Sequence, residues 1–335
     1  MIERIEKKRL AILRVLKNYT TPLASRTITN HLVHQGYDIS ERTVRFHLLD
    51  MDRDGLTEYI TRKGRRITPQ GIKELSKARV FEKVGFLNAK IDQMTYRMNF
   101  NLELRKGTVV VNTSLIRRDD LPGAAPLMKR VFDAGFSMGR LMTLFEPGEQ
   151  IGDISIPEGY VGIGTVCSIT LNGVLLSHGI PTHSRFGGIL EIENRKAARF
   201  IAIINYNGTS LDPLEIFTKS GMTDYIGATT NGNGLIGASF REVPAASRER
   251  VIEIAKRLDD IGLGGVYEVG LQGQDLCEIP LNEGLVGIIV IGGLNPVAIL
   301  AESGYDVSLN ALSGHVNYNR LFTYEELDAR ITKLC

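Results

Sequence analysis

Polar side chains that could bind or activate a small molecule gather in residues 178–193, which read HGIPTHSRFGGILEIE. A planar guanidinium can donate two parallel hydrogen bonds to a carboxylate, and glycine lets backbone N–H groups approach a ligand closely. The set therefore suits a small dianion better than an apolar molecule. In the structural alternative, Arg185 pairs with Glu191 or Glu193, and His183 is an ordinary loop residue. The candidate ligand contacts are the polar residues and glycines of this segment, together with one upstream serine: Ser114, Thr182, His183, Ser184, Arg185, Gly187 and Gly188.

Catalysis is the competing chemistry for the same residues. Ser114 and Ser184 are candidate nucleophiles, but no G-x-S-x-G elbow or other motif fixes a triad around either. His178, His183 and His315 could bind a metal, yet the first two lie in a Gly- and Pro-containing segment without a helix that would align their rings. The glycine-rich residues 226–237 have no lysine in a P-loop position. We therefore expect no catalytic residue, no metal and no cofactor.

The formal net charge of +2 is divided unevenly along the 335 residues. The first 80 residues hold 17 Lys and Arg against 9 Asp and Glu, whereas the remainder holds 23 against 29. A basic N-terminal part indicates contact with a polyanion. The three cysteines have neither a disulfide-framework spacing nor a metal spacing, which favours a reducing interior. Because no segment has the length of a membrane span and the start is too polar for a signal peptide, we expect a cytoplasmic protein without membrane contact.

The basic N-terminal part predicts helices followed by a β-hairpin. Apolar residues recur at helical spacing in residues 3–19, and Ser25 and Ser40 are N-cap candidates for two further helices. An Asp-Gly turn then leads into a strand, residues 56–61, and a basic hairpin tip, residues 62–66. Three helices followed by a two-stranded hairpin with a cationic tip are typical of a winged helix-turn-helix.

In such a module the helix that follows Ser40 enters the major groove of DNA and the hairpin contacts the backbone. Arg42 or Arg45 could donate two hydrogen bonds to a guanine edge, and the hairpin cations could neutralise phosphates. The alternative is a solvated basic face on a protein-binding winged module. The candidate DNA contacts are the exposed-type residues of the helix and of the hairpin tip: Ser40, Arg42, Thr43, Arg45, Phe46, Arg62, Lys63, Arg65 and Arg66.

Residues 79–106 predict a structured bridge. Apolar residues fall three or four apart from Val80 to Met94, which predicts a helix. From Tyr96 to Leu104 they alternate strictly, which predicts a half-buried strand. A stiff bridge could pass motion between domains, and it is also a candidate contact between two subunits.

Residues 107–335 contain a weak internal repeat. PEGYVGIG at 157–164 recurs as NEGLVGII at 282–289, and the same offset of 125 places VNTS at 111–114 over IGAS at 236–239. Each half holds a helix followed by short strands that glycines interrupt. We therefore expect two pseudo-symmetric halves, about 107–200 and 232–320, with a ligand cleft between them.

The predicted winged helix and two further segments, FEKVGFLNAKIDQMTYRMNF (81–100) and GIPTHSRFGGILEIEN (179–194), together resemble NrpR, the archaeal family of nitrogen-responsive transcriptional repressors. The resemblance covers essentially the full chain. It implies a homodimer that binds an inverted-repeat DNA operator, represses nitrogen-fixation and glutamine-synthetase genes, and is released by 2-oxoglutarate. This keto dicarboxylate is compatible with the guanidinium and hydroxyl cluster. Fuller versions of the family carry two tandem effector domains, whereas this chain has one, which implies a second NrpR-type partner chain for single-domain versions.

We therefore expect an α+β protein with an N-terminal winged helix-turn-helix at residues 1–78 and a bridge at 79–106. An α/β effector domain built from the two pseudo-symmetric halves follows at 107–335. We interpret the chain as a ligand-responsive repressor and not as an enzyme. Its ligand would favour a dimer geometry in which the two recognition helices no longer match successive major grooves. Two alternatives are an enzyme for a small carboxylate fused to a DNA-binding domain, and a winged-helix protein-interaction module.

Overall fold

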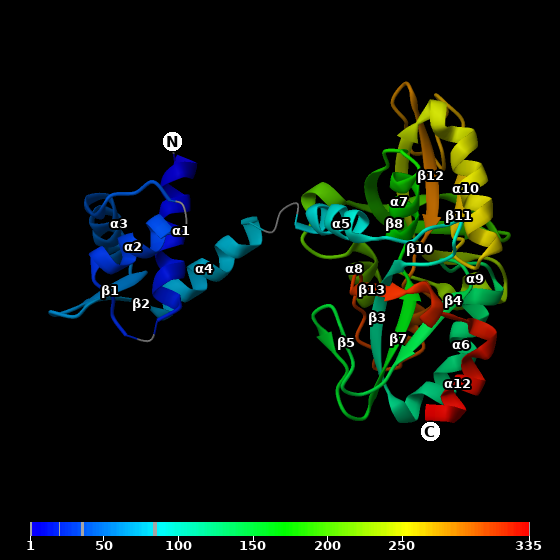
Figure 1. The fold of residues 1–335 in the computed structure, drawn as a ribbon, viewed down its shortest axis with the longest axis horizontal. Coiled ribbons are helices and arrows are strands. Elements are labelled where there is room, and N and C mark those ends of the chain that lie inside the picture. Colours follow the sequence, from blue (N-terminus) through cyan, green and yellow to red (C-terminus); the bar gives the residue numbers. More distant parts are fainter. Residues whose placement is uncertain (1, 20, 35–36, 83–85, 335) are drawn as a thin grey trace. The chain divides into compact units, whose positions relative to one another are not determined.

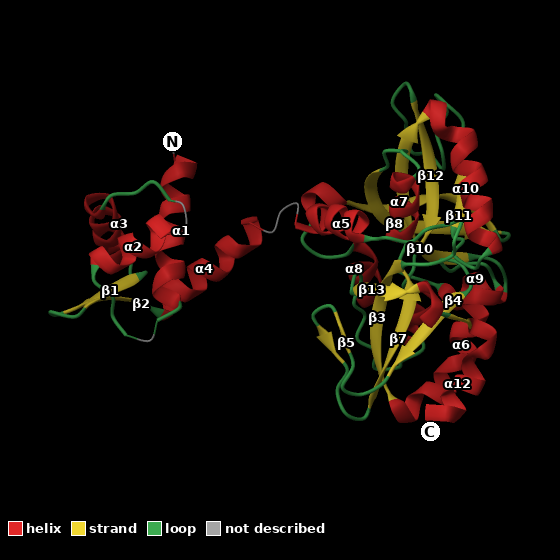
Figure 2. Cartoon of the chain, in the orientation of Figure 1, coloured by secondary structure: helices red, strands yellow, loops and turns green. Residues whose placement is uncertain are grey.

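The chain folds into two compact units, residues 1–84 and 85–335 (Figure 1). Their boundary falls inside the predicted bridge, because one helix of the bridge belongs to each unit. The first unit is mostly helical, whereas the second combines strands and helices (Figure 2). Within the described part of the chain, no helix is long and apolar enough to cross a membrane. The residues described in this computed structural model are 2–19, 21–34, 37–82 and 86–334.

The first unit is a helical bundle with a two-stranded wing. Its core is formed by apolar residues that include Ile12, Leu32 and Leu48, each fully buried. The two wing strands are antiparallel. This architecture confirms the predicted winged helix-turn-helix. Its elements are α1 (Ile2–Lys17), α2 (Ser25–His34), α3 (Glu41–Arg53), β1 (Thr57–Ile60), β2 (Gly64–Ile67) and α4 (Pro69–Glu82).

The second unit repeats one order of elements twice: strand, 3-10 turn, helix, two strands, helix, strand. The first copy consists of β3 (Thr108–Arg117), η1 (Arg118–Asp120), α6 (Leu121–Asp133), β4 (Leu141–Phe145), β7 (Tyr160–Val166), α7 (Ile169–Ser177) and β8 (His183–Glu193). The second copy consists of β10 (Gly234–Pro244), η3 (Ala245–Ser247), α10 (Arg248–Asp260), β11 (Val266–Val269), β12 (Leu285–Ile291), α11 (Asn295–Glu302) and β13 (Gly314–Asn317).

The other elements precede, join or follow these copies. They are α5 (Phe86–Arg97), β5 (Gln150–Ile151), β6 (Ile154–Ser155), β9 (Lys196–Asn205), η2 (Tyr206–Gly208), α8 (Pro213–Lys219), α9 (Tyr225–Thr230), η4 (Tyr318–Arg320), β14 (Phe322–Thr323), η5 (Tyr324–Glu326) and α12 (Leu327–Leu334).

The two copies exchange their last helix and strand. The strands form two antiparallel sheets, ordered β13-β3-β7-β4-β14 and β11-β12-β10-β8-β9. Strand β8 of the first copy therefore completes the sheet of the second copy, and β13 of the second copy completes the sheet of the first. The preceding helices follow the same exchange: α11 packs with α6, and α7 shares a core cluster with α10. The predicted pseudo-symmetric α/β domain is thus present, in an interlocked form.

The strand registers correct one detail of the repeat. Ser114 pairs with Ile163 and Arg241 pairs with Ile288, while the two isoleucines are themselves 125 residues apart. The counterpart of Ser114 is therefore Arg241 and not Ser239, which the uniform offset had placed there. The long strands differ from the rest of the repeat by two positions, so an offset taken from glycine-containing segments misaligns them.

The predicted strand at residues 96–104 is wrong. Helix α5 continues to Arg97, and the residues that follow form turns. Phe100 is buried and packs on the ring of Tyr318 at a centroid distance of 5.1 Å, whereas Leu104 is 68% exposed. Of the five alternating residues, only Phe100 and Leu102 are buried, and the turns bury them without a partner strand. The predicted helix 80–94 corresponds to the end of α4 and most of α5, and residues 83–85 between them lie outside the described residues.

Candidate nucleic-acid interface and effector cavity

Helix α3 presents an exposed face of basic and apolar side chains. Ser40 begins the helix by accepting a hydrogen bond from the backbone N–H of Thr43, as its N-cap role predicts, so both residues support the helix start. Phe46 is 61% exposed, so its aromatic ring is available for contact with a partner. The exposed residues lie three or four apart on one face: Arg42, Arg45, Phe46, Leu49 and Arg53.

The four cations of the wing divide into two kinds. Arg65 donates from Nε to Asp52 Oδ2 at 2.8 Å and retains only 14% side-chain exposure, so it ties the wing to α3. Arg66 pairs with Glu58 on the neighbouring strand. Arg62 and Lys63 lie exposed at the tip, and no carboxylate among the described residues pairs with either. The tip therefore offers two cations for phosphates, while Arg65 has a structural task.

The predicted effector segment forms the start of β8, where Arg185 is already paired. Its Nη1 lies 3.0 Å from Glu242 Oε1 and also donates to the carbonyl of Pro280 at 2.8 Å. His183 Nδ1 lies 3.2 Å from the other oxygen of Glu242. The Glu242 side chain is only 8% exposed, so Arg185 compensates the charge of a nearly buried carboxylate. Arg185 thus pairs with a β10 residue instead of the neighbouring Glu191, which binds Arg199.

The other predicted effector residues do not converge on one site. A Cβ at Gly187 would lie 2.9 Å from Pro213, and one at Gly188 would lie 2.7 Å from the carbonyl of Ala202, so these glycines allow close packing. Thr182 bonds locally to the carbonyl of Ile180. Ser114 is fully buried within the other sheet. Of the set, Ser184 alone joins the polar network of the interior that is centred on Arg241.

Arg241 is a fully buried cation whose hydrogen-bond partners are all neutral. Its Nε donates to Asn172 Oδ1 at 2.7 Å, and its Nη1 donates to Ser239 Oγ at 2.6 Å. Its Nη2 donates to Ser168 Oγ at 3.0 Å, while Asn172 donates in turn to Ser184 Oγ at 2.9 Å. No carboxylate of the described residues pairs with it, and burial lowers the pKa of Arg241. A buried charge without a counter-charge is costly and is a common mark of a binding site.

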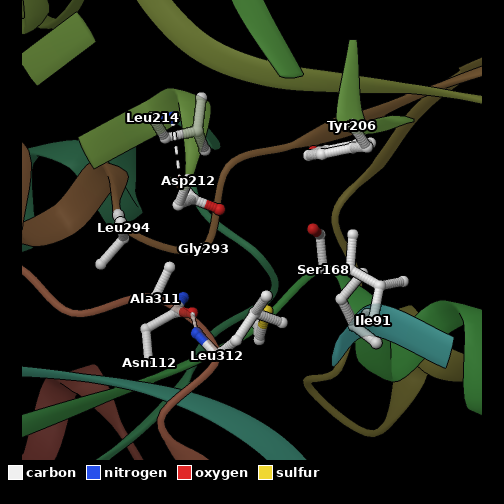
Figure 3. A pocket seen from close by; sticks show the side chains of 12 residues that line it. Ile91, Asn112, Ser168, Tyr206, Asp212, Leu214, Gly293, Leu294, Ala311 and Leu312 are labelled. Atoms are coloured by element: carbon white, nitrogen blue, oxygen red, sulfur yellow. Dashed lines mark hydrogen bonds between the residues drawn. The ribbon is translucent and has the colours of Figure 1, made fainter. Parts of the chain in front are cut away.

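Beside this network lies a cavity at the junction where the two copies exchange elements. It is bounded by the starts of α7 and α11, by α5, and by the segments before α8 and β13: Ile91, Asn112, Cys167, Ser168, Ile169, Tyr206, Asp212, Leu214, Gly293, Leu294, Ala311 and Leu312. In Figure 3 the Asp212 carboxylate and the Ser168 hydroxyl point into the cavity from opposite sides. The space inside it measures about 20 Å³, enough for a single water molecule.

The ionisable groups around the cavity are strongly affected by burial. Burial, reinforced by the charge of Glu215, raises the pKa of Asp212 to about 6, although its carboxylate also caps α8. Burial likewise raises the pKa of the Cys167 thiol to about 11, so this cysteine is a poor nucleophile. The cavity therefore has an acidic side and, behind Ser168, a basic side. Within the described residues, no cluster of side chains is suited to a metal ion.

Sequence reasoning missed Arg241, Asn172 and Asp212. One signal was available: Arg241 directly follows the mostly apolar residues LIGASF (235–240) of a central strand, where a charge is unexpected. The other two residues acquire their roles only through the exchange of α7 between the copies. No local motif indicates that exchange.

Comparison with known proteins identifies both units. Residues 84–323 match the family described as NrpR regulatory domains NRD1 and 2, and residues 10–75 match the ribonuclease R winged-helix domain. This chain belongs to the NrpR family. The resemblance inferred from the sequence is therefore confirmed.

Relatives in the NrpR family match over nearly the whole chain. The global nitrogen regulator NrpRI of Methanosarcina mazei is 36% identical over 321 residues, which cover 96% of this chain and 99% of that protein. NrpR of Methanococcus maripaludis is 32% identical over 90% of this chain, and NrpR of Methanocaldococcus jannaschii is 31% identical over 95%. The match spans only 52% and 55% of those two proteins, so they are about twice as long.

A solved NrpR-like structure agrees with the fold of the second unit. The crystal structure of a nitrogen repressor-like protein from Methanococcus jannaschii superimposes with a TM-score of 0.60 and 28% identity. The match covers 70% of this chain and 97% of that one. The α+β effector fold is thus a property of the family.

Proposed function

We propose that this NrpR family member is a transcriptional repressor of nitrogen-assimilation genes. It binds an inverted-repeat operator as a homodimer and is released by 2-oxoglutarate. The relatives are named global nitrogen regulators, and the winged unit has the shape of a DNA-binding module. The longer relatives support a second NrpR-type chain as a further partner.

The observation that carries the DNA-binding part is the exposed cationic surface of the winged unit. Arg42 on α3 and Arg62 and Lys63 at the wing tip have no carboxylate partner among the described residues. A recognition helix and a wing tip with free cations can contact base edges and phosphates respectively. Two such units related by a dimer axis would read half-sites about one helical turn apart.

The experiment is operator binding by fluorescence anisotropy at fixed salt, with and without millimolar 2-oxoglutarate. The proposal expects specific binding that the ligand weakens by at least about tenfold, equivalent to about 1.4 kcal/mol. Specific binding that ignores the ligand would overturn the effector part of the proposal. Equal affinity for the operator and for random DNA would favour the protein-interaction module instead.

An enzyme for a small carboxylate is the remaining alternative. The only thiol at the cavity, Cys167, is held in its protonated form by burial. Product analysis after incubation with 2-oxoglutarate tests this alternative, and the proposed function expects the ligand to be recovered unchanged.

A further inference from the structure

The tip of the wing holds an arginine in a backbone conformation that arginine rarely adopts. The N–H of Lys63 donates to the carbonyl of Ile60 at 2.9 Å and closes a β-turn in which Arg62 is the third residue. Its φ of +60° lies in the left-handed region, where the third residue of a turn is preferably Gly or Asn. A residue kept in a costly conformation is a common mark of a functional position. This residue is a solvent-exposed cation without a carboxylate partner among the described residues.

One carboxylate of α3 fixes the base of the wing. Asp52 accepts from Thr57 Oγ1 on β1 at 2.6 Å and from Arg65 Nε on β2 at 2.8 Å. The backbone of Arg65 also exchanges two hydrogen bonds of 2.9 Å with Leu23, in the segment before α2. Because both strands are tied to the helices, the tip keeps a fixed position relative to α3.

The wing is long enough to cross one DNA backbone when α3 lies in the major groove. Its strands have four residues each, a length of about 13 Å. In Figure 1 the turn between β1 and β2 projects beyond the helices of the winged unit. The groove on the other side of that backbone is a minor groove, about 6 Å wide. The tip therefore meets the minor groove about five base pairs, half a helical turn, from the bases that α3 contacts.

We propose that Arg62 enters this minor groove and selects A·T base pairs beside each half-site. This inference rests on the proposed function, because it presupposes specific operator binding. A·T-rich DNA has a narrow minor groove with an enhanced negative potential, which attracts a cation. Guanine places a 2-amino donor in the same groove, and a guanidinium, which only donates, cannot pair with it. Arg62 therefore disfavours G·C pairs at these positions.

The two cations of the tip have different tasks. A guanidinium is planar and more weakly hydrated than an ammonium group, so Arg62 enters a narrow groove at a lower cost than Lys63 would. The ammonium group of Lys63, on its flexible stem, suits the phosphates of the crossed backbone and adds affinity without sequence preference. The neighbouring lysine is therefore a matched control for the arginine.

The test uses the full chain without 2-oxoglutarate and an operator obtained by selection from random DNA. Three duplexes keep the selected half-sites and differ only in the adjoining base pairs, which are A·T, G·C or inosine·C. Inosine lacks the 2-amino group of guanine, so an inosine·C pair combines the major groove of G·C with a minor groove like that of A·T. The wild type is expected to bind the A·T and inosine·C duplexes equally, and at least about fivefold more tightly than the G·C duplex, in fluorescence anisotropy.

Two variants assign the preference to one residue. Arg62→Gly removes the side chain and suits the left-handed backbone, so the wing keeps its turn. This variant is expected to bind the three duplexes within about twofold of one another. Lys63→Ala is expected to weaken binding to all three duplexes by the same factor and to keep the preference.

Three results would overturn the role of Arg62. Equal affinity of the wild type for all three duplexes would restrict the tip to phosphate contacts. Binding of the inosine·C duplex as weak as that of the G·C duplex would place the discrimination in the major groove. A preference that persists in Arg62→Gly would belong to another residue. Failure of the selection to yield any preferred sequence would instead overturn the proposed function and, with it, this inference.

Discussion

Gly293, at the start of α11, lies directly against the backbone of Val166 at the end of β7. A Cβ at Gly293 would be 2.2 Å from the carbonyl oxygen of Val166 and 3.1 Å from the Cα of Cys167. Val166 and Gly293 precede α7 and α11, the two helices that the copies exchange. The two exchange points are therefore in backbone contact, and no space is left for a side chain at Gly293. Gly293→Ala is expected to lower the free energy of unfolding by about 2 to 3 kcal/mol, measured by urea denaturation. Gly208→Ala is the control, because a Cβ at Gly208 meets nothing within 4 Å.

The raised pKa of Asp212 predicts a pH-dependent stability. Its folded pKa of about 6 exceeds the ordinary 3.8, so the folded protein holds this proton more tightly than the unfolded chain. The resulting penalty is present above pH 6 and disappears as the pH falls from 6 towards 4. Asp212→Asn, which can still cap α8, is expected to raise the melting temperature at pH 8, to give a smaller gain at pH 5 and to lose the gain near pH 4. Asp224→Asn, at the N-cap of α9, should give no such pattern; an equal gain there would contradict the explanation.

The structural role of Arg185 can be tested by substitution. Arg185→Met leaves the nearly buried Glu242 without its cation and is expected to destabilise the effector unit by about 3 kcal/mol in thermal unfolding. Arg185 is not among the residues that line the cavity beside Ser168. The affinity of the Arg185→Met variant for 2-oxoglutarate should therefore stay within about threefold of that of the wild type. A large loss of ligand affinity without a loss of stability would instead indicate that the effector contacts Arg185 at the start of β8.

The exposed ring of Phe46 predicts a contact that forms only with DNA. Phe46→Ala removes an aromatic side chain that is 61% exposed, so the unfolding free energy should change by less than about 0.5 kcal/mol. Operator affinity is expected to fall at least about fivefold in anisotropy, because aromatic and apolar side chains on a recognition helix contact thymine methyl groups. Val33→Ala on α2, where Val33 is 53% exposed, serves as the control and should preserve binding.

The two kinds of wing cation predict two different phenotypes. Lys63→Ala should weaken binding to operator and random DNA alike and reduce the salt dependence by about one counterion, without a change in stability. Arg65→Ala should lower the melting temperature of the winged unit, because it breaks the ion pair with Asp52. Equal melting temperatures for the two variants would show that Arg65 does not anchor the wing.

Local sequence signals predicted the winged unit because its structure is determined locally. Ser40 caps α3, and the wing turn requires the left-handed backbone that Gly64 supplies with a φ of +113°. The failed strand at 96–104 shows the limit of this reasoning. An alternation of apolar residues makes a sheet only where a partner strand is present, and here Tyr96 and Leu104 are not even buried. In residues 98–107 the only pairing is a bridge between Asn101 and Lys106.

The buried polar network around Arg241 and the cavity beside it could not be predicted in the same way. Ser168, Arg241 and Leu312 come from distant parts of the chain, and the exchange of α7 and α11 alone brings them together. The polar segment at 178–193 attracted the prediction because its chemistry is visible in one line of sequence. Most of that chemistry is used within the fold, where Arg185 neutralises Glu242.

The interlocked copies also constrain how the chain reaches its native state. Leu312 and Asn112, which are hydrogen-bonded, stand 200 residues apart, and β13 completes a sheet whose first strand, β3, is synthesised long before it. Closure over such a separation is slow, and until then the edge of β3 stays open to wrong partners. Neither copy can mature alone during translation. Each serves as the template on which the last part of the other is placed, so the cavity at their junction comes into existence only at the final step of folding.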